Sequence, residues 1–255
     1  MPRPRTYRTP AIILKRRDIG EADRLVTLLT PLHGKVDAVA TGARRPASTR
    51  AGHVELFTRA DVLIAKGRDL GILTQAELVQ PYLGLHEDLT RGAYANYVVE
   101  LMDRFTYDGD VDTEPLFKLL DATLARLCDD DDLRRVVRYY EIQLLEHVGF
   151  RPELHECVVT REPILPMDQF FSYSEGGVVS PEGANLGANS VPLSLHMLKL
   201  LRHMQRSAYK QVSTLRITEA LHGDTERLMV SYIRYILEAR VQSVDFIQHL
   251  RRLES

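Results

Sequence analysis

The chain has 255 residues, of which 44% are hydrophobic and 27% charged, with a net charge of −2 at pH 7. This composition supports packed cores, and the length fits two domains of about 100–200 residues each. The sequence has no run of about 18 apolar residues that would span a membrane, its two cysteines are too few for a disulfide framework, and no apolar segment of a secretory signal follows the basic Met1–Arg5. We therefore expect a soluble, cytoplasmic protein.

Charge is distributed unevenly along the chain. Residues 1–80 contain 14 Lys and Arg against 8 Asp and Glu, a net charge of +6, whereas residues 81–255 contain 19 against 27, a net charge of −8. A local basic excess is typical of a domain that faces a polyanion, and binding responds to this local field rather than to the whole-chain charge. The pattern favours a nucleic-acid-binding N-terminal domain and a remainder that contacts other proteins.

Residues 1–80 predict five short strands separated by turns that contain glycine. Apolar and β-branched residues alternate with polar ones, as in half-buried strands, and no long amphipathic helix interrupts them. This pattern predicts a five-stranded barrel such as the OB-fold, while SH3-like barrels and sandwiches share the same periodicity. The expected strands begin at Ala11 and then cover Arg24–Thr30, Lys35–Ala40, Glu55–Ala65 and Ile72–Val79.

Basic side chains are spread over these strands and over the loop Gly42–Arg50. Each Lys or Arg that contacts a phosphate neutralises backbone charge and releases counterions. The aromatic residues that barrels use for base stacking are scarce here, because only Tyr7 and Phe57 are available, so we expect binding that is electrostatic and largely independent of base sequence. The expected DNA contacts are Arg16, Arg17, Arg24, Lys35, Arg44, Arg45 and Arg50.

After Pro81 the hydrophobic period changes from two to about 3.6, which predicts an all-helical domain over residues 81–255. Asp132 is placed to cap the third helix and Gly149 to end it. The expected helices have apolar faces at Tyr94–Phe105, Leu116–Leu127 and Val136–Val148, followed by helices at Leu193–Tyr209, Thr214–Leu221 and Asp224–Ala239.

Residues 150–192 interrupt this helical pattern with five prolines and a Gly176-Gly177 pair. We expect a loop-rich insertion with one hairpin, in which Phe171–Ser174 turns into Val178–Ser180. The candidates for its small core are Phe170, Phe171 and Tyr173.

No motif in the chain predicts catalysis. Walker-type GxxxxGK[ST], Rossmann GxGxxG, HExxH and GxSxG patterns are all absent from the sequence. The densest carboxylate run is Asp129–Asp132, but metal-dependent chemistry needs carboxylates that converge from separate elements. We expect this run to be solvated and the protein not to be an enzyme, with a metal-dependent nuclease the least favoured alternative.

A second basic row lies in the helical part. It recurs at three- and four-residue spacing beside an apolar row of Met and Leu, which is typical of the solvated face of an amphipathic helix. The functional alternative is a groove for an acidic peptide or for DNA with an apolar floor. The residues of this row are Lys199, Arg202, Arg206 and Lys210.

Several segments together resemble the bacterial RecO family of DNA-repair proteins. They are the run Arg16–Thr30, the Gly34-Lys35 pair, Gly42–Arg45 with Ser48 following, and Asp69–Leu78. The order of parts agrees over the whole chain, with a barrel first, then a helical domain, and an insertion at the place of the family's zinc site.

The resemblance implies an OB-fold followed by a helical domain, and a recombination mediator without ATPase activity. Such a protein binds single- and double-stranded DNA and anneals complementary strands. It works with RecR, and in many bacteria RecF, to load RecA onto DNA coated by single-strand-binding protein. The helical domain commonly recognises the acidic C-terminal tail of that protein, and we expect Lys199, Arg202 and Arg206 to bind it. Association with the nucleoid follows from this expectation.

The chain departs from the family pattern at the zinc site, where many members carry Cys-x-x-Cys twice. Cys157 matches the first position, but the other three positions hold Thr160, Ser180 and Gly183. A structural zinc site needs four ligands, and one thiolate does not supply them, with only His155 and Glu156 nearby as further donors. We expect no cofactor and a metal-free insertion held by its own packing.

Two other functions fit the same residues. The first is a protein–protein adaptor of a repair complex, whose barrel binds a partner and has little intrinsic DNA affinity. The second is an RNA-binding module, which a preference for RNA over DNA would reveal.

Overall fold

The computed structural model describes residues 6–43, 54–67, 70–110, 112–187 and 189–254. The chain divides into two compact units, one formed by Met1–Asp130 with Gln242–Ser255 and the other by Asp131–Val241. Strands give way to helices after residue 80, where the sequence places its domain boundary, yet the first unit also contains the helices that follow directly. No helix in the described ranges is long and apolar enough to cross a membrane.

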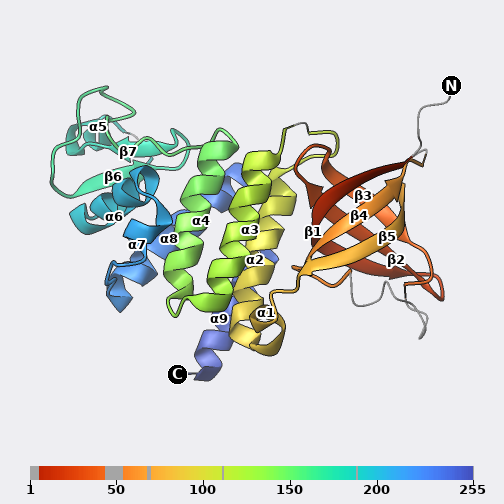
Figure 1. The fold of residues 1–255 in the computed structure, drawn as a ribbon. Helices are drawn as coiled ribbons and strands as arrows, with labels where there is room; N and C mark the ends of the chain where they lie inside the picture. Colours follow the sequence, from red (N-terminus) through yellow and green to blue (C-terminus); the bar gives the residue numbers. More distant parts are fainter. Residues whose placement is uncertain (1–5, 44–53, 68–69, 111, 188, 255) are drawn as a thin grey trace. The chain divides into compact units, whose positions relative to one another are not determined.

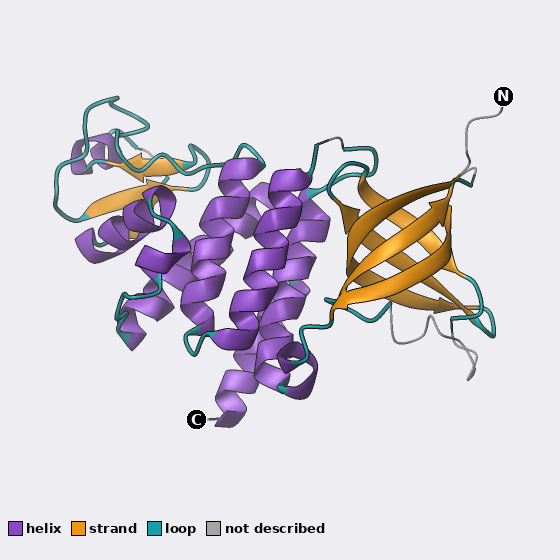
Figure 2. Cartoon of the chain, in the orientation of Figure 1, coloured by secondary structure: helices purple, strands orange, loops and turns teal. Residues whose placement is uncertain are grey.

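The first unit begins with a closed barrel, which confirms the prediction of five strands (Figures 1 and 2). The strand order is β1-β2-β3-β5-β4, and only the short β3–β5 pairing that closes the barrel is parallel. The strands are β1 (Thr6–Ile19), β2 (Asp23–Thr30), β3 (Gly34–Ala40), β4 (Arg59–Ala65) and β5 (Gly71–Gln80).

Two strand boundaries differ from the sequence prediction for local reasons. Strand β1 begins at Thr6, before the expected start at Ala11, because its first half pairs with β4 and its second half with β2. Strand β4 starts at Arg59 rather than Glu55. The residues before it form a turn in which the N–H and hydroxyl of Thr58 donate to the carbonyl of Glu55, and Phe57 has a left-handed φ of 67°.

The barrel core follows the two-residue period of the strands. Ala11, Ile13, Val26, Leu28 and Ala38 point inward and are 0% exposed. Because side chains that lie directly opposite on paired strands share a face, this register assigns every residue of β1 to β3 either to the core or to the outer face.

Helices of the first unit pack beside the barrel, and polar contacts connect the two parts. Asp121 accepts hydrogen bonds from the guanidinium group of Arg59 (2.6 Å) and from the hydroxyl of Tyr82. The Thr113 hydroxyl donates to the carbonyl of Thr30 at 2.6 Å. The helices are α1 (Gly84–Glu87), α2 (Leu89–Phe105), α3 (Glu114–Asp129) and α9 (Gln242–Glu254).

Helix α9, which the sequence analysis does not predict, is held at its start by Glu100 of α2. The Glu100 carboxylate accepts from the backbone N–H groups of Gln242 and Ser243, each at 2.9 Å, and from the Ser243 hydroxyl at 2.6 Å. Arg104 adds an ion pair at 3.1 Å. These contacts satisfy N–H groups at the helix start that have no partner within the helix.

The second unit combines helices with a three-stranded sheet of order β7-β6-β8. Phe171 pairs with Val178 across β6 and β7, which confirms the predicted hairpin, and the Asp132 carboxylate caps α4 by accepting from the N–H of Arg135 at 2.9 Å. Its elements are α4 (Leu133–His147), β6 (Gln169–Ser172), β7 (Gly177–Val179), α5 (Pro181–Asn185), β8 (Val191–Leu193), α6 (Leu195–Arg206), α7 (Tyr209–Val212) and α8 (Glu219–Leu237).

One helix prediction in this unit is wrong. The sequence favours two helices, at Thr214–Leu221 and Asp224–Ala239, whereas the structure has the single helix α8 from Glu219 to Leu237. Thr218 caps it, because its hydroxyl accepts from the N–H of Leu221 at 3.3 Å. Gly223, which suggests a break, lies inside the helix because tertiary packing outweighs the cost of about 1 kcal/mol for a mid-helix glycine.

The Glu100 contacts predict a pH dependence of stability. Burial raises the pKa of Glu100, but the hydrogen bonds from Ser243 and Gln242 and the charge of Arg104 outweigh it, so the pKa lies below the usual value. A depressed pKa stabilises the folded state above the unfolded-state pKa of about 4.3, and this contribution is lost as pH falls through the lower folded-state value.

The test compares thermal unfolding of the wild type and Glu100→Gln across a pH series. We expect the variant to unfold at a lower temperature at pH 7, and the difference to shrink below about pH 4, where the wild-type carboxylate becomes protonated. A difference that is the same at both ends of the series would contradict this assignment.

Candidate nucleic-acid interface

Two of the predicted DNA contacts, Arg16 and Arg24, lie at one end of the barrel on the inward face. Arg16 pairs directly with the core residue Val26, and Asp18 pairs with Arg24. Arg24 precedes Val26 by two residues and therefore shares its face. Both arginines continue the row of core side chains to the rim of the barrel.

Glu55 joins these two arginines. Its carboxylate forms an ion pair with Arg16 and another with Arg24 at 3.2 Å, and Arg24 also contacts Asp18 at 3.0 Å. The Arg24 side chain is only 14% exposed. Two positive and two negative charges therefore balance at the rim. The sequence does not reveal this role of Glu55, because a single carboxylate in a strand-like run gives no signal of its cationic partners.

Arg17 has a different environment. It pairs with Leu25 on the outer face of the barrel, is exposed, and its side chain forms no hydrogen bond or ion pair with other described residues. Of the predicted contacts on β1 and β2, it is the one whose charge is fully available to a phosphate.

The three remaining arginines of the predicted set, Arg44, Arg45 and Arg50, lie outside the described residues, so their role stays a prediction. The residues on either side of this segment, Ala43 and Val54, are buried in the barrel core.

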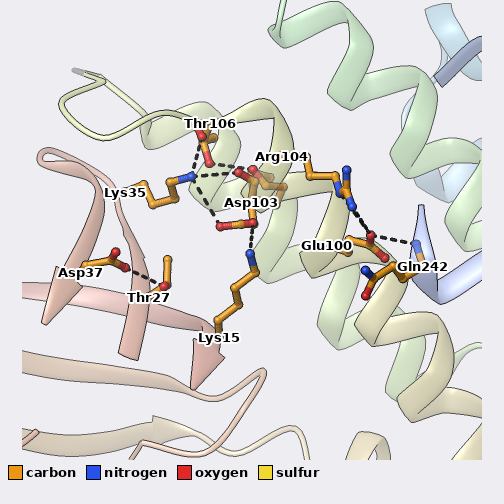
Figure 3. Close-up of polar contacts among 10 residues, drawn as sticks. Lys15, Thr27, Lys35, Asp37, Glu100, Asp103, Arg104, Thr106 and Gln242 are labelled. Carbon is orange, nitrogen blue, oxygen red and sulfur yellow. Dashed lines mark hydrogen bonds and ion pairs between the residues drawn. The ribbon is translucent and has the colours of Figure 1, made fainter. Parts of the chain in front are cut away.

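Lys35 is the predicted contact whose position argues against DNA binding (Figure 3). Its ammonium group donates to the carbonyls of Thr106 (2.8 Å) and Asp103 (2.9 Å) and lies 3.4 Å from the Asp103 carboxylate. Lys15 pairs with the same carboxylate. Because the Lys35 side chain is only 15% exposed, it connects the barrel to α2, and we omit it from the proposed DNA contacts.

The aromatic residues of the barrel do not form a stacking platform. Phe57 is only 4% exposed. Tyr7 is half-buried, with its ring centroid 4.2 Å from that of His33 and 5.7 Å from the Lys66 ammonium group. Among the described residues of the barrel, aromatic rings therefore offer little surface on which a base could stack.

The three residues predicted to bind a partner lie on helix α6, whereas Lys210 of the same basic row lies on α7, and the three differ in availability. Lys199 and Arg206 are exposed. Arg202 is half-buried and donates two hydrogen bonds, of 2.6 and 2.8 Å, to the carbonyl of Leu154. Burial lowers the pKa of Arg202; the charge of Glu153 opposes this shift, and the charge of Arg206 adds to it. Arg202 thus fixes the insertion to α6, while Lys199 and Arg206 remain accessible.

The four positions that correspond to the family's zinc ligands converge in the insertion, but the residues do not fit the metal. The Cys157 sulfur accepts hydrogen bonds from the N–H groups of Ser180 (3.2 Å) and Thr160 (3.4 Å) and from the Ser180 hydroxyl (3.4 Å). A Cβ at Gly183 would lie 3.0 Å from this sulfur. Throughout the described ranges, no group of three His, Cys, Asp or Glu side chains could hold a metal ion.

Together these features define a class of protein: an OB-fold barrel, a fold that binds oligonucleotides in many proteins, joined to helical elements. Residues 3–82 match the family model described as Recombination protein O N terminal, and residues 86–245 match Recombination protein O C terminal. The chain belongs to the RecO family of DNA repair proteins.

Relatives from several bacteria agree with this assignment over nearly the whole chain. A DNA repair protein RecO from Roseiflexus sp. is 39% identical over 98% of this chain and 88% of its own length. The RecO proteins of Dehalococcoides mccartyi and Symbiobacterium thermophilum are 31% and 32% identical, over 99% and 96% of this chain and 99% and 98% of their own lengths.

The position of Asp103 predicts a marked effect of its replacement on stability. Asp103→Asn removes the charge that Lys15 and Lys35 share, and we expect it to lower the free energy of unfolding by about 1–3 kcal/mol in denaturant titration. The matched control is Glu77→Gln, which removes a carboxylate from an ion pair with Arg8 whose side chains are 75% and 62% exposed. The control should change stability by less than about 1 kcal/mol. Equal effects of the two substitutions would show that the Asp103 contacts stabilise the protein no more than an exposed ion pair does.

Proposed function

We propose that this protein is a non-catalytic recombination mediator that binds DNA, anneals complementary strands and helps load RecA onto DNA coated by single-strand-binding protein. The observation that carries the proposal is the match to both RecO family models, together with a barrel whose sequence has a net charge of +6. The barrel is the expected DNA-binding part, with Arg17, Arg44, Arg45 and Arg50 as principal contacts and Arg16 and Arg24 at the rim.

The mechanism is electrostatic. Two complementary strands repel each other through their phosphates, and a cationic surface lowers this repulsion when it contacts both. Base pairing between the strands, and not the protein, supplies the specificity. The paired strands are then released from the cationic surface. No step requires nucleotide hydrolysis.

The helical elements are the proposed partner-binding part. Lys199 and Arg206 on α6 are exposed cations that suit the acidic C-terminal tail of single-strand-binding protein. RecR is the proposed partner within the loading complex, with RecF and RecA as further members. This arrangement brings the mediator to DNA that is already coated.

Annealing of two complementary labelled oligonucleotides over a salt series, with and without single-strand-binding protein, tests the function directly. We expect annealing to weaken steeply as the salt concentration rises, because DNA binding releases counterions and added salt opposes their release. We also expect annealing to persist when single-strand-binding protein coats the DNA. Annealing that is indifferent to salt would contradict the electrostatic mechanism.

The double replacement Arg44→Ala and Arg45→Ala tests the proposed contacts. We expect weaker binding of single-stranded DNA and a slope of log affinity against log salt reduced by about 1.4, because each phosphate contact contributes about 0.7. Arg227→Ala is the matched control, since this arginine is 75% exposed in the second unit and pairs with Asp224. Unchanged binding by the double variant, with an unchanged melting temperature, would exclude these arginines from the interface.

The alternative function is a protein–protein adaptor of a repair complex. The internal pairing of Arg16, Arg24 and Lys35 favours it, because these charges are partly or wholly neutralised within the protein. Complex formation with RecR in the absence of any DNA affinity at low salt would support the adaptor over the mediator.

We further propose that the insertion folds without zinc. Cys157 is 0% exposed, and the hydrogen bonds from Ser180 and Thr160 lower its pKa to about 6 against the opposing effect of burial. Hydrogen bonds to the Cys157 sulfur thus connect the segments around Thr160 and Ser180, which a zinc ion would connect in the family pattern.

Metal analysis and thermal unfolding test this proposal. The purified protein should contain far less than one zinc per chain, and a chelator should leave its melting temperature unchanged. Cys157→Ala should cost about 1–3 kcal/mol of stability, because buried N–H groups lose their acceptor. Stoichiometric zinc, or unfolding by the chelator, would contradict the proposal.

A further inference from the structure

The second unit contains a cavity of about 620 Å³ lined with aromatic side chains. Phe150, Tyr173, Tyr232 and Tyr235 all contribute to its wall. Phe150 and Tyr235 are 46% and 52% exposed, whereas Tyr232 is 3% exposed and forms part of the floor. The volume lies within the range of about 300–1,000 Å³ that is typical of sites for small molecules or single chemical groups.

Phe150 is held rigidly although its ring is exposed. It follows Gly149, whose φ of 83° ends the helical conformation after α4. The Phe150 N–H donates to the carbonyl of Leu145 at 2.8 Å, and its own carbonyl accepts from the Tyr232 hydroxyl at 3.1 Å. Both backbone groups of the residue are therefore fixed, which lowers the entropic cost of using the ring as a contact surface.

The other aromatic residues come from separate rigid elements. Tyr232 and Tyr235 lie three residues apart on α8 and so share a helix face. Tyr173 follows strand β6, and its ring centroid lies 5.8 Å from that of Phe171, a 1% exposed residue of the insertion core. The end of α4, the helix α8 and the β6–β7 turn thus each present an aromatic ring to one cavity.

The charges around the cavity indicate what kind of group it suits. The lining includes Arg151, Arg234, Glu175 and Glu238, so its formal charges balance. This balance disfavours a run of carboxylates, such as an acidic peptide, inside the cavity. It suits an uncharged planar group. Arg151 lies at the surface beside the cavity, where its half-exposed side chain forms an ion pair with Glu146 at 3.1 Å.

We propose that this cavity binds an unpaired base of single-stranded DNA by stacking on Phe150 and Tyr235. The inference rests on the proposed DNA-binding function and adds to it a second site, in the unit that does not contain the barrel. It accounts for base contacts that the barrel lacks, since Tyr7 and Phe57 are not free to stack. Stacking on aromatic rings tolerates all four bases, so the site agrees with binding that is independent of sequence.

The test compares oligothymidylate with an abasic strand of equal length at fixed salt, by fluorescence anisotropy. The wild type should bind the base-bearing strand more tightly. Phe150→Ala and Tyr235→Ala should each weaken that binding about tenfold, the equivalent of 1.4 kcal/mol for one stacked base, and leave the abasic strand unaffected. Tyr235→Phe should retain wild-type affinity because the ring remains. Tyr107→Ala is the matched control, since Tyr107 is 70% exposed and does not line the cavity.

Photocrosslinking provides a readout that does not depend on affinity. DNA substituted with 5-iodouracil should crosslink to peptides that contain Phe150 or Tyr235, as identified by mass spectrometry. Equal binding of both strands by the wild type, with no crosslink to these peptides, would overturn the base site and leave the proposed function standing. Loss of binding to an acidic tail peptide by the alanine variants, with DNA binding intact, would overturn it in favour of a peptide site. A wild type that binds neither strand would overturn the base site and the proposed function together.

Discussion

The pairing of Lys15 and Lys35 with Asp103 is the interaction on which the first unit depends. The Asp103 side chain is only 11% exposed, and a buried charge without a partner is energetically costly. Both of its partners come from the barrel, whereas Asp103 belongs to α2. The barrel and the helices that follow it are thus connected by charge as well as by packing. The Arg59 and Tyr82 contacts with Asp121 provide a second connection between the same parts.

The basic residues that were predicted to contact DNA fall into two groups among the described residues. Lys35, Arg16 and Arg24 form ion pairs with carboxylates of the protein, whereas the Arg17 side chain is exposed and unpaired among the described residues. The number of cations in the barrel sequence is therefore an upper bound on the number that are available to DNA. Since affinity for a polyanion scales with the number of free cations that contact phosphates, the exposed arginines matter more than the total.

The second unit has the complementary character. Its exposed cations on α6 and its aromatic cavity are the two features on which the proposed contacts with a partner and with a DNA base rest. The insertion supports both, because Arg202 connects it to α6 through Leu154 and Phe171 packs against Tyr232 of α8 with centroids 5.2 Å apart. Within this insertion the Cys157 sulfur accepts hydrogen bonds from the N–H and the hydroxyl of Ser180.

The barrel, most helices, the hairpin and the family could be predicted from the amino-acid sequence, because these depend on local periodicity, turn residues and short motifs. The sequence did not reveal α9 or the continuity of α8 across Gly223, since both depend on contacts with distant residues such as Glu100. The sequence likewise shows which residues are charged, but not which groups they contact. Lys35 reads as a surface cation, and only the tertiary structure brings Asp103 and Thr106 to it, because pairing across 68 and 71 positions is a property of the packed chain.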